Sequence, residues 1–131
     1  MKRRKMGSFC IDCDVANLLN TKRVISVPKM LVDTGAESSW VPALVLRQLG
    51  IQPVKKDLVF QMADGRTITR SIGYAWLHAG DFETVDEVVF GQPGDLAILG
   101  ARTLEGFGAR VDPRAKRLVA SGPHLAAVGR V

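Results

Sequence analysis

The sequence contains little cysteine, little histidine and no long apolar run, and these absences limit the chemistry open to the protein. Its two cysteines are Cys10 and Cys13, and its two histidines are His78 and His124, far from the cysteines and from each other. A structural zinc site needs about four such ligands brought together, so the sequence predicts no metal and no cofactor. No apolar stretch approaches the ~20 residues of a membrane-spanning helix, so no membrane partner is expected.

The C-x-x-C spacing of Cys10 and Cys13 has two interpretations. A redox pair of this kind usually lies at the start of a helix that follows a strand. Here the flanking residues Phe9, Ile11 and Val15 are typical of a strand, and residues three apart on a strand point to opposite faces. We therefore favour two ordinary thiols in a reducing compartment over a redox pair.

The charge distribution does not favour a nucleic-acid partner. The formal net charge is +5, but the four basic residues at positions 2–5 account for all but one of these charges, and only 6% of the residues are aromatic. We interpret residues 1–7 as a basic N-terminal arm and expect no nucleic acid to bind. Asp12 and Asp14 interrupt the apolar segment that a secretory signal would need, so the expected location is cytoplasmic.

The length of 131 residues fits one compact domain, expected over residues 8–120 and followed by a C-terminal tail, residues 121–131. Most segments are typical of short strands, rich in Val and Ile and separated by Gly, Pro and Asp. The expected strands are 8–16, 22–27, 29–33, 57–62, 66–78, 84–90, 96–99, 108–111 and 116–120. One short helix is expected over Pro42–Leu49, and Ala101–Glu105 is expected to form no more than one turn, closed by Gly106.

The segment 30–36, MLVDTGA, carries the candidate chemistry. A buried apolar run leads directly into Asp33, although burying a carboxylate is costly unless it is paired or hydrogen-bonded. Thr34 can hydrogen-bond to nearby backbone, and Gly35 allows another backbone to approach closely. The alternative is a turn at the end of a strand, capped by the aspartate. The tripeptide alone does not decide between them.

A second segment decides the interpretation. Another apolar run, Ala97–Leu99, leads into Gly100 and a helical turn, and an Asp-Gly hairpin signal lies between the two segments at 62–65. With these parts in this order, the chain resembles the retropepsin family, the single-domain relatives of pepsin found in retroviruses, retrotransposons and stand-alone bacterial proteins. The matching motifs are LVDTGA at 31–36 and ILG at 98–100, and the resemblance extends over about residues 8–120.

The resemblance implies a fold, a partner and a set of site residues. The fold would be a closed, mainly β, acid-protease barrel that works as a homodimer. Asp33 of each subunit would meet its twin and activate a water molecule, Thr34 would brace the loops across the interface, and Gly35 would lie against the substrate backbone, with Ala36 completing the loop. The supporting strand and turn would be Ile98, Leu99 and Gly100. The flap that closes over the polypeptide substrate would carry Met62, Ala63, Asp64 and Gly65 at its tip, although an ordinary surface hairpin is the alternative.

The homodimer also has a physical argument of its own. Hydrolysis of a peptide bond by this route needs two carboxylates close together, one ionised and one protonated. The chain has one Asp-Thr-Gly and no Asp-Ser-Gly, and it is too short for the two lobes of a pepsin-like monomer. One active site must then be shared by two chains.

The chain departs from the viral members of the family at two places. Its flap is poorer in glycine, with Asp64 beside the only glycine there, and the segment after Asp-Thr-Gly-Ala begins with Glu37 where viral enzymes usually carry aspartate. The arginine that usually follows the second glycine is displaced by one position, to Arg102. Three roles of Glu37 therefore stay open from the sequence: a pair with Arg102, a contact with substrate backbone, or a solvated acid in a turn.

The remaining candidates favour structural roles. Trp40 and Trp76 are expected to be core or half-buried packing residues, with stacking on substrate as the alternative. His78 is expected to be a surface or hydrogen-bonded histidine of a strand and not a catalytic base. No H-E-x-x-H or G-x-S-x-G motif occurs. The sequence thus predicts an aspartic endopeptidase with a homodimeric site; the alternative is a catalytically silent, dimeric peptide-binding module of the same fold.

Overall fold

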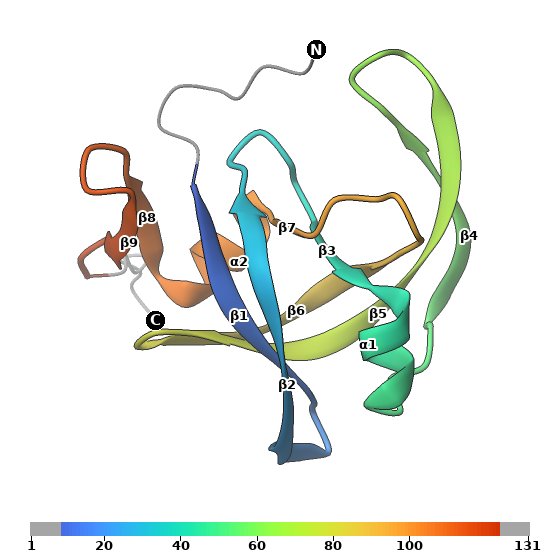
Figure 1. Cartoon of the computed structure of the whole chain (residues 1–131), viewed down its shortest axis with the longest axis horizontal. Helices are drawn as coiled ribbons and strands as arrows, with labels where there is room; N and C mark the ends of the chain where they lie inside the picture. The colour runs from blue at the N-terminus through green and yellow to red at the C-terminus, as the bar shows by residue number, and fades with distance from the viewer. Residues whose placement is uncertain (1–8, 124–131) are drawn as a thin grey trace, which may run out of the picture.

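The structure, a computed structural model, describes residues 9–123 (Figure 1). In this part of the chain, alternating apolar and polar residues form nine strands, and two short helices accompany them. The elements are β1 (Cys10–Asn17), β2 (Asn20–Val32), β3 (Ser39–Pro42), α1 (Ala43–Gln48), β4 (Lys55–Gln61), β5 (Thr67–Ala79), β6 (Phe82–Gly91), β7 (Ile98–Leu99), α2 (Ala101–Phe107), β8 (Ala109–Asp112) and β9 (Arg117–Ala120). The predicted mainly β class is confirmed. The basic arm, residues 1–7, and most of the tail lie outside the described residues.

Seven strands form one sheet in the order β1-β2-β7-β3-β6-β5-β4, and β1 also pairs with β5. Six strands are therefore connected in a circuit of hydrogen-bonded neighbours, while β4 pairs with β5 alone and extends the sheet as an arm. The pairs β2–β7 and β3–β6 are parallel, and the others are antiparallel. β8 and β9 form a separate hairpin.

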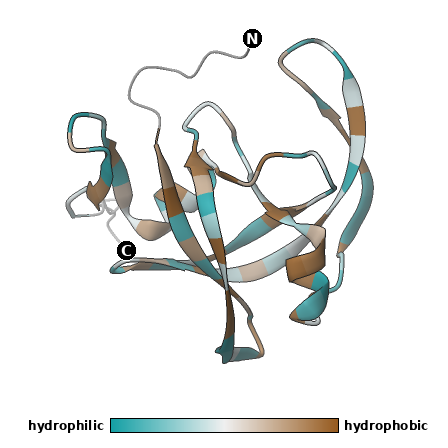
Figure 2. Ribbon diagram, in the orientation of Figure 1, coloured by the Kyte–Doolittle hydropathy of each residue, from teal (hydrophilic) through white to brown (hydrophobic). Residues whose placement is uncertain are grey.

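The core lies on one face of this sheet and is filled by the alternate residues of each strand. Figure 2 shows the resulting bands of hydrophobic and polar residues along the strands. The side chains of Met30, Leu77 and Leu99 are fully buried, and Leu46 of α1 joins them. Phe82 and Phe107 stack with their ring centroids 6.0 Å apart, which fastens α2 to β6. No helix in the described residues is long and apolar enough to span a membrane.

The second helix is longer than the sequence indicated. α2 continues past the expected stop at Gly106 to Phe107, because Leu104 and Phe107 are both buried beneath it. The helix ends at Gly108, whose φ of 67° is the left-handed conformation common after helices. Gly106 instead lets Thr84 pack directly against the helix. The expectation that this segment forms no more than one turn closed by Gly106 was therefore wrong, because a glycine needed for close packing was interpreted as a terminator.

The strands differ from expectation at two places. The segments 22–27 and 29–33 form one strand, β2, with an irregularity in its pairing near Pro28. There Lys29 takes a φ of 53°, and its backbone N–H donates to the Asp12 carboxylate, 3.0 Å away. β3 was not predicted. It is short and its two partners, β6 and β7, are distant in sequence.

Candidate active site

Asp33 lies where β2 ends beside β7. The two strands are parallel, with Leu31 opposite Ile98 and Val32 opposite Leu99. The backbone N–H of Asp33 donates to the Leu99 carbonyl oxygen at 3.0 Å, which continues the ladder one residue beyond the strand. The buried strand therefore positions the aspartate backbone, and the second apolar segment found in the sequence supplies the hydrogen-bond partner.

The Asp-Thr-Gly segment forms a tight turn closed on the aspartate. Asp33 Oδ1 accepts the Gly35 N–H at 2.9 Å, and the Asp33 carbonyl accepts the Ala36 N–H at 3.2 Å. Asp33 is half-buried, whereas Thr34 and Gly35 are exposed. Among residues 9–123, the Gly35 N–H is the only hydrogen-bond donor to the Asp33 carboxylate. The carboxylate is thus oriented by its own turn and remains accessible to a further partner.

The N-terminus of α2 supports the residues that follow the turn. The first N–H groups of a helix have no partner within the helix. In α2, the Ala101 N–H donates to the Ala36 carbonyl at 2.8 Å, and the Arg102 N–H donates to the Glu37 carbonyl at 3.1 Å. These donors therefore hold the loop that carries Asp33.

Gly100 allows the loop and the helix to approach this closely. A Cβ atom at this position would lie 2.5 Å from the Ser38 carbonyl oxygen and 3.0 Å from that of Ala36. The φ of Gly100 is −91°, which any residue can adopt. Glycine is required here by space and not by backbone conformation.

A chain of buried hydroxyl groups lies beneath the loop, and no pattern in the sequence predicted it. The Gly100 N–H donates to Ser39 Oγ at 2.9 Å, Ser39 Oγ lies 2.5 Å from Thr103 Oγ1, and Thr103 Oγ1 donates to Asp86 Oδ2 at 2.9 Å. Since the Thr103 proton goes to Asp86, the Ser39 hydroxyl donates to Thr103. Ser39 and Thr103 are fully buried, so each member of the chain depends on its neighbour.

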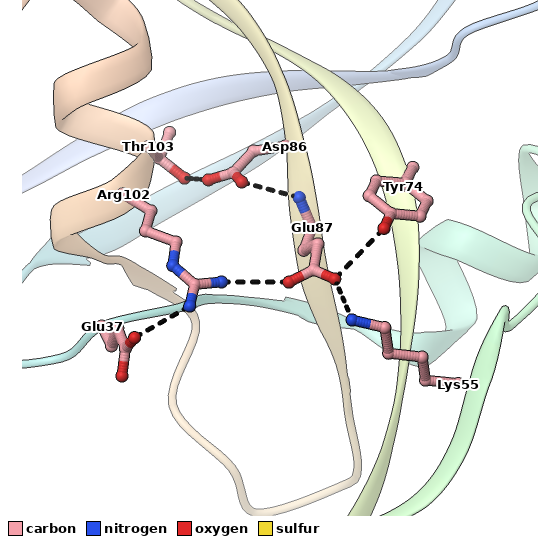
Figure 3. Close-up of polar contacts among 7 residues, drawn as sticks. All are labelled: Glu37, Lys55, Tyr74, Asp86, Glu87, Arg102 and Thr103. Carbon is pink, nitrogen blue, oxygen red and sulfur yellow. Dashed lines mark hydrogen bonds and ion pairs between the residues drawn. The ribbon is translucent and has the colours of Figure 1, made fainter.

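A charged cluster lies beside this chain (Figure 3). We call Glu37, Lys55, Tyr74, Glu87 and Arg102 the Glu87 cluster. Its central carboxylate, on β6, accepts the Lys55 ammonium at 2.6 Å, the Tyr74 hydroxyl at 3.2 Å and the Arg102 guanidinium at 3.0 Å. Arg102 also reaches the Glu37 carboxylate at 2.8 Å. The cluster therefore connects the base of the β4–β5 arm to the residue just after the Asp33 turn.

These contacts change the ionisation of the cluster. The hydrogen bond from Lys55 holds the pKa of Glu87 below its usual value, and the hydrogen bond from Tyr74 and the positive charge of Arg102 act in the same direction. The same hydrogen bond raises the pKa of Lys55. The Glu37 side chain is 75% exposed, so its pair with Arg102 is weak by itself. Of the possibilities left open by the sequence, the structure shows the pair of Glu37 with Arg102.

The candidate flap is the tip of the β4–β5 hairpin. The Met62 N–H donates to the Arg66 carbonyl at 2.7 Å, and the Gly65 N–H donates to the Met62 carbonyl at 2.9 Å. The Asp64 carboxylate accepts the Arg66 backbone N–H at 3.0 Å and its Nε–H at 2.7 Å; chiefly the backbone donor holds the pKa of Asp64 below its usual value. Ala63, Asp64 and Gly65 are exposed. These contacts all stay within the hairpin.

The tryptophans and the histidine pack as the sequence predicted. Trp40 is half-buried and meets Phe60 of β4 edge to face, with ring centroids 5.4 Å apart. Trp76 stacks on His78, also at 5.4 Å, and the His78 ring nitrogen Nδ1 lies 3.2 Å from the Asp14 carboxylate. His78 is thus a hydrogen-bonded residue of a strand.

The two cysteines are free thiols. Cys13 is fully buried, and burial raises the pKa of its thiol to about 12. A thiol with so high a pKa is not ionised near neutral pH, so it is a poor nucleophile and a poor metal ligand. In residues 9–123 no three His, Cys, Asp or Glu side chains lie together as a metal site would require.

Comparison with known families agrees with this geometry. The family model described as "gag-polyprotein putative aspartyl protease" matches residues 20–106. The chain belongs to this aspartyl protease family. The match begins at the start of β2 and ends within α2, so it contains the Asp33 turn, the hairpin tip and the Ile98–Gly100 segment that are expected in a retropepsin-like protein. No curated protein matches the chain.

Proposed function

We propose that the protein is an aspartic endopeptidase whose active site is assembled from two copies of the chain. The observation that carries this proposal is the state of Asp33. Its backbone N–H is bonded to Leu99, and among the described residues its half-buried carboxylate accepts a hydrogen bond from the Gly35 N–H alone, which leaves it open to a further partner. A carboxylate prepared in this way in an aspartyl protease family member lacks only a second acid.

The second acid is supplied by another copy of the chain. The reaction needs one carboxylate that is ionised and one that keeps its proton, which two carboxylates achieve by repelling each other's charge. The sequence contains a single Asp-Thr-Gly and no Asp-Ser-Gly. A two-fold axis through the site would bring Asp33 against its twin and make both halves equivalent.

In the proposed reaction, a water molecule lies between the two Asp33 carboxylates. The ionised carboxylate takes a proton as the water oxygen bonds to the scissile carbonyl carbon, and the protonated carboxyl group gives its proton to the carbonyl oxygen. Collapse of the tetrahedral intermediate breaks the carbon–nitrogen bond as the amide nitrogen is protonated. Each turnover consumes one water and returns the pair to one shared proton.

The other parts of the structure have roles consistent with this reaction. The circuit of six strands would be the closed retropepsin-like barrel of each subunit, and the hairpin tip at Met62–Gly65 would close over the substrate and exclude water. Both the hairpin tip and the turn that follows β2 project toward the same end of the molecule, the upper side of Figure 1. Thr34, exposed at the turn, would brace the loop across the two-fold axis.

Cleavage of a mixed peptide library tests the proposal. The wild type is expected to cut peptides, and Asp33→Asn is expected to lose at least about a thousandfold in kcat/KM, because asparagine can neither take nor give the proton. Asp81→Asn is the matched control, since Asp81 is an exposed aspartate of the β5–β6 turn. If the wild type cuts no peptide at acidic or neutral pH but still binds pepstatin, the result would favour the catalytically silent binding module.

Mixing the two forms tests the shared site. When equal amounts of wild type and Asp33→Asn exchange subunits freely, about a quarter of the dimers contain two Asp33 residues. Activity should therefore fall to about half of that of the unmixed wild type, counted per wild-type subunit. If each subunit worked alone, the activity per wild-type subunit would not change, and the dimeric mechanism would be wrong.

A further inference from the structure

An apolar row crosses the sheet on the face that Asp33 occupies. Alternate residues of a strand point to opposite faces, and Val32, Leu99 and Val41 point into the core. Their neighbours Leu31, Ile98 and Trp40 therefore point to the other face, and so does Asp33, two residues after Leu31. The pairing register continues the row across five strands. Its members are Leu31, Ile98, Trp40, Val89 and Ile72.

The far end of this row is buried although it lies outside the core. Val89 is 0% exposed and Ile72 is 6% exposed, but neither belongs to the main core cluster, whose β6 residues are Val88 and Phe90. Leu31, Ile98 and Trp40 are half-buried. The row thus changes from a buried end at Val89 and Ile72 to a half-buried end beside Asp33.

Trp40 lies at the transition between these two ends. Its backbone pairs with Ile98 on one side and with Val89 on the other. Its ring meets Phe60, which is on the strand of the arm that leads into the hairpin tip. The indole therefore bridges the sheet and the arm, at the place where open apolar surface ends.

The charged cluster borders the same row. Glu87 and Tyr74 lie two residues from Val89 and Ile72 along their strands and face each other in the register, so they form the next row on this face. The row therefore has apolar side chains in its middle, the carboxylate of Asp33 at one end and paired charges along one edge.

We propose that Trp40 determines the specificity of the site by limiting the size of one substrate side chain. This inference rests on the proposed peptidase function and concerns the substrate. Neighbouring strands are about 4.8 Å apart and a bound peptide advances about 3.3 Å per residue. Trp40 is two strands away from Leu31, so its ring meets a side chain within about three residues of the scissile bond.

The expected substrate class follows from the volume of the indole. Trp40 fills the apolar row between Ile98 and the arm, and packed protein surfaces do not yield easily to an oversized group. The side chain that contacts Trp40 should be glycine, alanine or serine. A leucine or phenylalanine at that position would have to displace the ring from Phe60.

Kinetics with matched peptides tests this assignment. Peptides that differ only by Ala or Leu at one position, scanned over the three residues on each side of the cleaved bond, are compared for wild type, Trp40→Val and Trp40→Ala. At one position the wild type should prefer Ala, and the Trp40 variants should shift the Ala to Leu ratio of kcat/KM toward Leu by about tenfold or more. An unchanged ratio at every position would overturn the proposal.

The chain offers a matched control in its second tryptophan. Trp76 is also half-buried, but it lies opposite Ala16 and Val85 and is bonded through its indole N–H to Glu83, at 2.8 Å. Trp76→Val should leave the Ala to Leu ratio unchanged. If Trp76→Val shifted the ratio as much as Trp40→Val does, the effect would come from general loosening and the proposal would fail.

Binding without catalysis separates this proposal from the proposed function. In the double variant Asp33→Asn, Trp76→Phe, Trp40 is the only tryptophan, and its fluorescence is followed while the Ala and Leu peptides are added. Tighter binding of the Ala peptide, with a change in emission, supports the role of Trp40 even if the wild type cuts nothing. Cleavage by the wild type without any emission change on binding leaves the peptidase standing and removes the assignment. Because this fluorescence titration keeps Trp40 in place, it also tests the proposal if the Trp40→Ala variant does not fold.

Discussion

The two loops that the sequence singled out, the Asp33 turn and the hairpin tip at 62–65, are held in opposite ways. The Asp33 turn is bonded to other elements, through Leu99 of β7 and through the N-terminus of α2. Within residues 9–123, the hydrogen bonds of the hairpin tip all stay inside the hairpin. A glycine matters in each region, but for a different reason: Gly100, which lies beneath the Asp33 turn, is required by space, whereas Gly65, at the tip, is required by backbone conformation.

The difference agrees with what each loop would have to do in a peptidase. A carboxylate that must meet its twin within hydrogen-bonding distance needs a scaffold that fixes it. A segment that admits a substrate and then covers it needs few contacts with the rest of the molecule. Mutations should therefore have large effects on the folded state at the Asp33 turn and small ones at the hairpin tip.

The largest expected effect comes from Gly100→Ala. The added methyl group would lie against the Ser38 and Ala36 carbonyl oxygens, so α2 and the loop must move apart. We expect the free energy of unfolding to fall by about 2–4 kcal/mol and peptide cleavage to be lost. Urea denaturation at a fixed protein concentration measures the first, and the library assay measures the second.

Gly94→Ala is the control for this substitution. Nothing lies within 4 Å of a Cβ atom at Gly94, and its φ of 94° makes the substitution a purely conformational change. It should cost about 1 kcal/mol. A Gly100→Ala variant as stable and as active as the wild type would show that the loop does not depend on its close contact with α2.

The middle effect concerns the Glu87 cluster, which connects the two regions. The pKa of Glu87 is held below its ordinary value of 4.5, first by the hydrogen bond from Lys55. The contribution of this carboxylate to stability is therefore present above pH 4.5 and is lost as the pH falls through its lowered pKa in the folded protein. The pKa of Lys55 is raised above 10.5, so its contribution persists at neutral pH and is lost only above that value.

Glu87→Gln should accordingly lower the free energy of unfolding by about 1–2 kcal/mol at pH 7. The difference from wild type should shrink as the pH falls below 4.5 and through the lowered pKa of Glu87, because the wild-type carboxylate then becomes protonated as well. Glu83→Gln is the matched control, because Glu83 is on the same strand but bonds to the neutral indole of Trp76. Denaturation of the three proteins from pH 3 to 8 checks this, and a difference independent of pH would contradict it.

The sequence predicted those parts of the site that are encoded in adjacent residues. The hairpin at Asp64-Gly65 could be predicted, because its turn chemistry lies in adjacent residues. The turn at Asp33 could be predicted because an acid, a hydroxyl residue and a glycine follow a buried strand directly. β5 could be predicted from its alternation alone.

The parts that were missed depend on partners distant in sequence. Ser39 and Thr103 are 64 positions apart, and neither carries a local sign that its hydroxyl group is buried. β3 is a strand because Trp40 pairs with Val89 of β6 and with Ile98 of β7, both distant in sequence. Gly106 was interpreted as a helix end because its close neighbour, Thr84 of β6, is distant in sequence. Packing of this kind becomes visible only when the fold brings the partners together.

The smallest effect on stability is expected at the hairpin tip, with Gly65→Ala. Gly65 has a φ of +88°, and nothing lies within 4 Å of a Cβ atom there, so the substitution costs about 1 kcal/mol of backbone strain without a clash. Gly65→Asn should cost less, because asparagine tolerates positive φ better than alanine does. If the tip closes over substrate, Gly65→Ala should still lower kcat/KM several-fold, so the ratio of activity loss to stability loss should be larger than for Gly94→Ala. Urea denaturation and peptide kinetics on the three variants give this ratio. A loss of stability at Gly65 as large as that at Gly100 would mean that the tip is scaffolded after all, and the contrast between the two loops would disappear.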